Sequence, residues 1–246
     1  MIEIVNEIAV RAGREILKVY NDPSFFLSTK IERKSDHSPV TVADKKSNDI
    51  IACQLKHHFP EIPILSEEEK FIDYECRKDW KKFWLIDPLD GTKEFIKRND
   101  EFTINIALIE NGIPVLGVIY APVYNSLYYC YDDLAFKKEG DIVKRLVVRN
   151  RKDKLIAVRS RSHSIDKEDI TLKMYDVCEF MDIGSSLKFC MIAEGKADIY
   201  VREHPTMEWD TAAGHAIVLA AGGRVQGLNY NKPSLMNGSF QCFGFH

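Results

Sequence analysis

The stretch WLIDPLDGTKEF (residues 84–95) constrains the fold and the chemistry of this chain more than any other segment. Its first residues are apolar and belong to a short buried strand that the pattern predicts at residues 82–86. Asp87 follows this strand at once, and Pro88 fixes its own backbone and disfavours helix at the residue before it, so a turn is predicted here. The carboxylates of Asp87 and Asp90 are then expected to face one cavity.

The residues after the two aspartates predict the start of a helix. Gly91 tolerates backbone angles that other residues avoid, and Thr92 is a suitable cap for the helix KEFIKR (residues 93–98). Because the N-terminus of a helix favours negative charge, we expect this end to attract anions. The sequence therefore predicts carboxylates and an anion-binding helix end in the same place.

Two further acids extend this predicted site. Glu67 follows a predicted strand at residues 62–65, and Asp210 is predicted to cap the Ala-rich helix of residues 210–221. Four acids in one apolar interior would repel one another unless a cation lies among them. Ligands that are all oxygen, with no thiolate or imidazole companion, favour Mg²⁺ or Mn²⁺ over Zn²⁺. For any one of these acids alone, a solvated cap or turn residue is the open alternative.

The remaining elements follow from hydrophobic periodicity and turn residues. Helices are predicted at residues 2–20, 41–59, 166–175 and 185–194, and strands at 103–109, 116–120, 127–131, 155–159, 179–183 and 197–201. Short turns between the middle strands predict an antiparallel meander, whereas strands and helices alternate in the second half. The sequence has no repeat and no long linker, so any two lobes are expected to pack closely.

Length and composition bound the class of protein. The chain has 246 residues, of which 45% are hydrophobic, enough for one large core or two modest lobes. A net charge of -3 lacks the basic excess that neutralises a nucleic-acid backbone, so nucleic acid is not expected as a partner. No uninterrupted apolar segment suggests an integral membrane span, and we expect a cytoplasmic protein, leaving peripheral contact with the inner membrane open.

The six cysteines are scattered and form no zinc-binding pattern. We expect reduced, mostly buried thiols, with a disulfide framework as the alternative. These residues are Cys53, Cys76, Cys130, Cys178, Cys190 and Cys242.

Several segments resemble a known enzyme family, and the resemblance covers nearly the whole chain. Three of them resemble, in the same order, the signatures of the lithium-sensitive, magnesium-dependent phosphatases of the inositol monophosphatase superfamily: LSEEE (65–69), WLIDPLDGTKEF (84–95) and WDTAAGHAIVLAAGG (209–223). Others resemble the bacterial 3′(2′),5′-bisphosphate nucleotidases within it: SPVTVAD (38–44), SRSH (160–163) and IGSSLKFCMIAEG (183–195). The tail after Gly223 matches least well.

The resemblance implies a fold and an activity. The fold would be a layered α-β-α-β-α sugar-phosphatase fold of the α/β (α+β) class. An N-terminal α+β lobe (residues 1–150) would carry the acidic motifs, and a C-terminal α/β lobe (residues 151–246) would complete the substrate pocket. The activity would be Mg²⁺-dependent hydrolysis of 3′-phosphoadenosine 5′-phosphate (PAP) to AMP and phosphate, linked to sulfate assimilation and PAP recycling. An inositol or sugar monophosphate phosphatase and a catalytically silent nucleotide-binding sensor are the alternatives.

The resemblance also implies roles for single residues. The ligands of two or three Mg²⁺ ions, with Mn²⁺ as a substitute, would be Glu67, Asp87, Asp90, Asp210 and the backbone carbonyl of Leu89. For catalysis, Thr92 assisted by Asp44 would activate the attacking water, and Glu68 would hold another metal-bound water. Lys34 would lie near the third metal. Beside the metal ligands Glu67, Leu89, Asp90 and Asp210, the substrate would contact Gly91, Thr92, His163, Ser185, Lys188 and Arg202.

Some alternatives stay open at this stage. His163 and Ser185 would also serve as a turn or helix cap, and Lys188 and Arg202 as solvated charges. An aspartyl-phosphate mechanism is a rival to water activation, because an Asp at a strand end can act as a nucleophile. The D-x-D-x-T arrangement is absent, however, since Asp87 and Asp90 are three residues apart.

Overall fold

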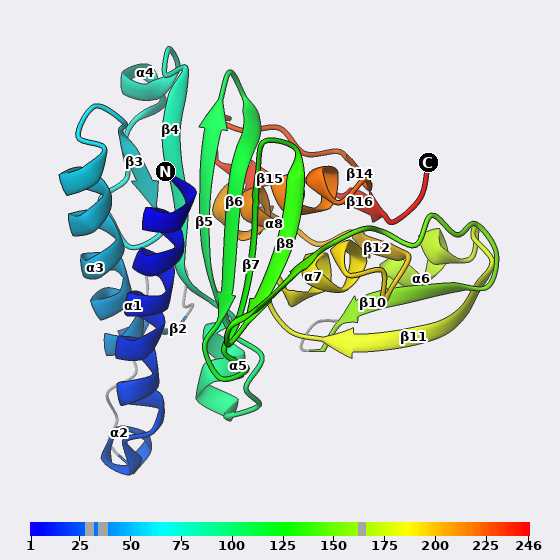
Figure 1. The fold of residues 1–246 in the computed structure, drawn as a ribbon, viewed down its shortest axis with the longest axis horizontal. Helices are drawn as coiled ribbons and strands as arrows, with labels where there is room; N and C mark the ends of the chain where they lie inside the picture. Colours follow the sequence, from blue (N-terminus) through cyan, green and yellow to red (C-terminus); the bar gives the residue numbers. More distant parts are fainter. Residues whose placement is uncertain (28–31, 34–38, 162–165) are drawn as a thin grey trace.

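The computed structural model describes residues 1–27, 32–33, 39–161 and 166–246, in which helices and sheets alternate as layers (Figure 1). The helices are α1 (Ile2–Tyr20), α2 (Pro23–Leu27), α3 (Val42–His58), α4 (Tyr74–Arg77), α5 (Thr92–Lys97), α6 (Asp166–Leu172), α7 (Leu187–Ala193) and α8 (Glu208–Ala220). Helix α1 has the predicted bounds, and Thr41 caps α3 as predicted, because its Oγ1 accepts a hydrogen bond from the Ala43 N–H (3.1 Å).

A seven-stranded sheet forms the centre of the described part of the first half, in the order β3-β4-β5-β6-β7-β8-β9. Its strands are β3 (Ile64–Ser66), β4 (Lys82–Asp90), β5 (Thr103–Glu110), β6 (Ile113–Ala121), β7 (Ser126–Tyr131), β8 (Leu134–Glu139) and β9 (Ile142–Arg145). Strand β3 runs parallel to β4, and the other neighbours are antiparallel, which confirms the predicted meander. Helices α1 and α3 cover one face of this sheet, and α8 packs on the other.

A second, five-stranded sheet follows in the described part of the second half, in the order β11-β10-β12-β16-β14. Its strands are β10 (Leu155–Ser160), β11 (Val177–Ile183), β12 (Ile199–Arg202), β14 (Arg224–Gln226) and β16 (Phe240–Phe243). Two short ladders pair β1 (Glu32–Arg33) with β2 (Pro39–Val40), and β13 (Thr206–Met207) with β15 (Met236–Asn237). Helices α7 and α8 lie between the two sheets (Figure 1), so the predicted α-β-α-β-α layering is confirmed.

Two predictions on single features need comment. The expectation of mostly buried thiols is wrong for half of them, because Cys53, Cys76 and Cys178 are exposed. Within the described residues, no helix combines the length and the apolar character that a bilayer crossing requires. The division into lobes at residue 150 stays a prediction.

Helix α8 is held tightly between its neighbours. A Cβ on Gly117 of β6 would lie 2.4 Å from the carbonyl oxygen of Ala213, and a Cβ on Gly214 would lie 2.4 Å from the ring of Phe189 in α7. Two glycines therefore allow the sheet and α7 to approach this helix from different sides. Because α8 carries Asp210, this packing fixes one predicted site residue relative to both halves.

Gly214→Ala tests this close packing. Alanine is intrinsically better than glycine inside a helix by about 1 kcal/mol. The overlap with the buried ring of Phe189 should outweigh that gain, so we expect the free energy of unfolding to fall by about 1–3 kcal/mol. Urea unfolding measures the change, and Gly238→Ala, where nothing lies within 4 Å of the added Cβ, is the control. Unchanged or increased stability of Gly214→Ala would contradict the packing argument.

Candidate active site

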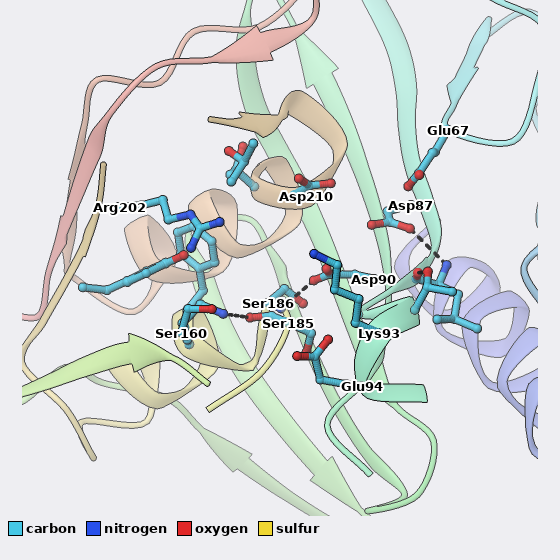
Figure 2. A pocket seen from close by; sticks show the side chains of 18 of the residues that line it. Glu67, Asp87, Asp90, Lys93, Glu94, Ser160, Ser185, Ser186, Arg202 and Asp210 are labelled. Atoms are coloured by element: carbon cyan, nitrogen blue, oxygen red, sulfur yellow. Dashed lines mark hydrogen bonds between the residues drawn. The ribbon is translucent and has the colours of Figure 1, made fainter. Parts of the chain in front are cut away.

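Asp87 and Asp90 lie at the end of β4, on either side of a β-bulge. Strand β4 continues through Asp90, and its register with β5 shifts between the two aspartates by one extra residue, so the predicted turn is wrong. Pro88 has no N–H to donate to the ladder, and the Leu89 N–H donates to Asp87 Oδ1 (3.0 Å). The bulge lets both aspartates line one pocket, as predicted (Figure 2).

Three acids form the tightest group in this pocket. Glu67, which follows β3, lies near Asp87 and Asp210, and one carboxylate oxygen from each falls within 4.8 Å of the others. Burial raises the pKa of Asp87 well above its usual range, and the charges of Glu67, Asp90 and Asp210 raise it further. Burial likewise raises the pKa of Asp210. Such a group holds either protons or a cation, and its oxygen-only donors fit a hard divalent ion.

Among the described residues, Asp90 is not a member of this three-acid group. Its Oδ2 accepts hydrogen bonds from the Ser186 N–H (2.6 Å) and from Asn105 Nδ2 (3.4 Å). Burial raises the pKa of Asp90, while the nearby Lys188 ammonium opposes the rise. Asp90 thus joins the acids to the second half of the chain.

Thr92 contacts Asp44, as the resemblance implied. Its Oγ1 donates to Asp44 Oδ1 (3.2 Å), and Asp44 Oδ2 accepts from the Thr41 N–H (2.8 Å) and the Thr41 hydroxyl (2.6 Å). Burial raises the pKa of Asp44 to about 6, against the opposing effect of the Thr41 hydrogen bonds. The prediction that Thr92 caps α5 is wrong, because Gly91, at φ 90°, is the N-cap and Thr92 is the first helical residue. The anion-binding helix end stays a prediction.

The cap predicted at Asp210 is also displaced. Helix α8 begins at Glu208, so Asp210 lies in its first turn, where its Oδ2 accepts from the Met207 N–H (2.8 Å). This hydrogen bond satisfies one backbone donor at the helix start and orients the carboxylate.

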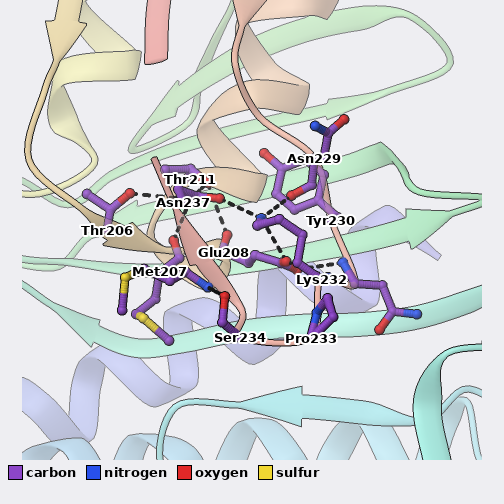
Figure 3. A network of polar contacts seen from close by, with 12 residues as sticks. Thr206, Met207, Glu208, Thr211, Asn229, Tyr230, Lys232, Pro233, Ser234 and Asn237 are labelled. Atoms are coloured by element: carbon purple, nitrogen blue, oxygen red, sulfur yellow. Dashed lines mark hydrogen bonds and ion pairs between the residues drawn. The ribbon is translucent and has the colours of Figure 1, made fainter. Parts of the chain in front are cut away.

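Glu208 anchors this first turn, although no role was predicted for it. Its side chain is fully buried and accepts from the N–H groups of Asn231 (2.7 Å) and Lys232 (2.8 Å), and the Lys232 ammonium lies 2.8 Å away (Figure 3). Arg77 of α4 also donates to the carbonyls of Lys232 and Pro233. The segment that leads into β15 is therefore clamped against the start of α8.

Glu208→Gln should loosen this clamp. A glutamine amide presents one acceptor oxygen and one NH₂ group, so it leaves a buried backbone N–H unsatisfied, and we expect a loss of about 2 kcal/mol in the free energy of unfolding. Chemical denaturation measures this loss. Glu75→Gln, at an exposed position paired with Lys78, should leave the unfolding midpoint unchanged. An equal effect of the two substitutions would refute the anchoring role.

The pocket is also lined by two buried cations, Lys188 and Arg202. Lys188 Nζ donates to the Ser185 carbonyl (2.6 Å), and burial lowers the pKa of this ammonium to about 8 despite the attraction of Asp90. Arg202 lies 3.7 Å from Glu168, and within the described residues its buried Nε has no hydrogen-bond acceptor. One pocket of about 280 Å³ is thus lined by both acids and cations, and Arg202 lies across it from Asp87 and Glu67 (Figure 2).

Most predicted site residues meet in this pocket. It is lined by the predicted Glu67, Asp87, Leu89, Asp90, Gly91, Thr92, Ser185, Lys188, Arg202 and Asp210, while Asp44 reaches it through Thr92. Lys34 and His163 lie outside the described residues, and Glu68 does not line the pocket although its charge raises the pKa of Asp44. Sequence reasoning missed other lining residues, including Lys93, Glu94, Ser160, Tyr200 and Thr206. Of these, Lys93, Glu94 and Ser160 could have been found from the sequence, because they lie in the quoted motifs WLIDPLDGTKEF and SRSH.

Comparison with known proteins agrees with this geometry. Residues 1–243 match the inositol monophosphatase family. The chain belongs to this family. It is 47% identical to the 3′(2′),5′-bisphosphate nucleotidase CysQ of Salmonella typhimurium, over 98% of both chains, and 45% identical to that of Buchnera aphidicola, over 100% of this chain and 92% of the relative.

Solved structures show the same relationship. The crystal structure of CysQ from Bacteroides thetaiotaomicron, described as a bacterial member of this family, superposes with a TM-score of 0.86 at 42% identity, covering 98% of this chain and 96% of that one. An inositol monophosphatase from Zymomonas mobilis gives a TM-score of 0.77 at 26% identity, covering 100% of this chain and 92% of that one. The family is metal-dependent, in agreement with the acids of the pocket.

Proposed function

We propose that this chain is a Mg²⁺-dependent 3′(2′),5′-bisphosphate nucleotidase that hydrolyses PAP to AMP and phosphate. The observation that carries the proposal is a single pocket lined by a group of acids and by the buried Lys188 and Arg202. A substrate with two phosphates suits such a pocket, because one phosphate reacts at the acids while the other pairs with the cations. The relatives named above as bisphosphate nucleotidases support the same substrate.

The acids would hold two or three Mg²⁺ ions, with Mn²⁺ as a substitute. Glu67, Asp87 and Asp210 already bring their oxygens together, and Asp90 and the Leu89 carbonyl would complete the ligand set. When bound, these ions lower the pKa of a water and neutralise charge on the phosphate and on the leaving oxygen.

The chain's own groups would handle the proton and the position of the phosphate. The hydroxyl of Thr92 donates to Asp44, which leaves an Oγ1 lone pair to accept a proton from the attacking water while its own proton moves to Asp44. Asp44 is ionised above about pH 6 and is then able to take that proton. Gly91 and Thr92 would contact the phosphate, and Glu68 would orient a second water.

The second half would recognise the nucleotide. Lys188 and Arg202 would hold the uncleaved 5′-phosphate, and Ser185 would lie beside the nucleoside. In this arrangement residues 1–150 supply all the acids except Asp210, and residues 151–246 supply the substrate wall.

Phosphate release from two substrates tests the proposal. With Mg²⁺ present, we expect far more efficient turnover of PAP than of inositol 1-phosphate. Preference for the inositol ester would overturn the substrate assignment in favour of an inositol or sugar monophosphate phosphatase. Tight binding of PAP with no turnover of either compound would instead indicate a nucleotide-binding sensor.

A further inference from the structure

Glu101 is a buried carboxylate to which the proposed hydrolysis gives no role. It lies between α5 and β5, and its side chain is only 10% exposed. It receives a two-pronged contact from Arg161, whose Nε and Nη2 donate to Oε2 (2.6 Å) and Oε1 (2.7 Å). The Gly184 N–H also donates to Oε2 (2.7 Å). Bidentate, charge-assisted contacts of this kind fix geometry as well as adding binding energy.

Both partners of Glu101 adjoin residues that line the pocket. Arg161 follows Ser160 at the end of β10, and Gly184 precedes Ser185 just after β11. Arg161 Nη2 also donates to the Asp182 carbonyl (2.6 Å), which ties the ends of β10 and β11 together. One carboxylate from the first half of the chain thus holds two strand ends from the second half.

The backbone after Gly184 has a conformation that depends on its surrounding contacts. Ser185 has a φ of 49°, a conformation that non-glycine residues hold only when their surroundings fix it. Glu101 accepts the N–H before this residue, Asp90 accepts the N–H after it, and Lys188 binds its carbonyl. The backbone that places Ser185 and Lys188 in the pocket is therefore set partly by Glu101.

We propose that Glu101 and Arg161 are positioning residues that shape the nucleotide-binding wall and so set substrate affinity, without taking part in hydrolysis. This inference rests on the proposed function. Neither residue lines the pocket within the described part of the chain, and both act through the ends of β10 and β11. Their loss should weaken the hold on the nucleotide and leave the phosphate site of Asp87 and Thr92 intact.

The test compares Glu101→Gln and Arg161→Met with a matched control on the same strand. Arg159→Met removes another guanidinium of β10, one that pairs with Asp182 (3.1 Å) and packs over Phe180. For Glu101→Gln and Arg161→Met we expect the KM for PAP and the inhibition constant of AMP to rise roughly tenfold. The kcat and the inhibition constant of inorganic phosphate should change less than about twofold, and Arg159→Met should change none of these values.

Further measurements keep the outcomes distinct. Arg161→Lys retains the charge but loses the two-pronged fork, so its KM should lie between those of the wild type and Arg161→Met. Unchanged affinity for AMP in both variants, or an equal loss of AMP and inorganic phosphate binding, would overturn the positioning role. A wild type that does not hydrolyse PAP would instead defeat the proposed function, and AMP binding by calorimetry would still decide the role of Glu101.

Discussion

Asp87→Asn is expected to abolish hydrolysis while making the metal-free protein more stable. The Asp87 carboxylate belongs to the group that would hold the metal ions. Bound metal ions stabilise the transition state by several kcal/mol, so losing them should lower kcat by at least ~10³-fold. Without metal, the same carboxylate is buried beside Glu67 and Asp210, and its charge is unfavourable. Asparagine removes that charge, and its side-chain oxygen still accepts from the Leu89 N–H.

The stability effect has a defined pH dependence. Because the pKa of Asp87 is raised on folding, the folded protein holds more protons than the unfolded chain above the ordinary pKa of 3.8. The Asp87 carboxyl therefore stabilises the fold at low pH, and this contribution is lost as pH rises through the pKa that the group has in the folded protein. In EDTA, wild-type Tm should fall as pH rises above about 4, and Asp87→Asn should reduce that fall.

Adding MgCl₂ completes this experiment. Magnesium should raise the Tm of the wild type, because an ion that binds only the folded state stabilises it. Asp87→Asn should lose most of that increase. The exposed Asp79→Asn serves as a control and should behave as the wild type does. Retained activity in Asp87→Asn, or a wild-type Tm that ignores magnesium, would refute the metal site.

Thr92→Val is expected to lower kcat by ~10²–10⁴-fold with little change in stability. Valine keeps the shape of threonine but removes the hydroxyl that donates to Asp44 and, in the proposed mechanism, would link the attacking water to it. The capping of α3 by Thr41 and Asp44 stays intact, so the fold is preserved. Thr171→Val, which removes a hydroxyl that donates to Glu203 and does not line the pocket, should leave kcat unchanged.

The pH profile gives a second readout of this pair. Wild-type kcat should decline at acidic pH, where Asp44 takes up a proton and would no longer accept one from Thr92; without metal the pKa of Asp44 is about 6. Cations bound near Glu67 would move this decline to lower pH, because positive charge favours the ionised carboxyl. If Thr92→Val keeps the wild-type kcat and the same decline of kcat at acidic pH, Thr92 has no catalytic role.

Much of the fold could be predicted because its signals are local. The apolar spacing of α1 and the cap of α3 lie within a few residues of one another in the sequence. Strands β8 and β9 were missed because much of this hairpin is exposed, so no buried face marks it. The starts of α5 and α8 were misplaced by one or two residues, since the left-handed Gly91 and the extended Met207 lead into each helix before the expected cap.

The residues of the candidate site also differ in whether the sequence alone predicts them. Glu67, Asp87 and Asp90 adjoin predicted strands, so their convergence could be inferred from the sequence. Glu101 could not be recognised, because its partners Arg161 and Gly184 lie 60 and 83 residues further along the chain. Lys188 and Arg202 were predicted as site residues only from the family resemblance, because no spacing in the sequence distinguishes them from surface cations.

The position of α8 between the two sheets also bears on how the protein is made. During synthesis the strands of the first sheet leave the ribosome before α8, and their apolar face stays uncovered until that helix arrives. Asp210 arrives with it, so an incomplete chain has an exposed apolar sheet and lacks one acid of the pocket. Truncated products should therefore be substrates for chaperones and proteases rather than weak phosphatases.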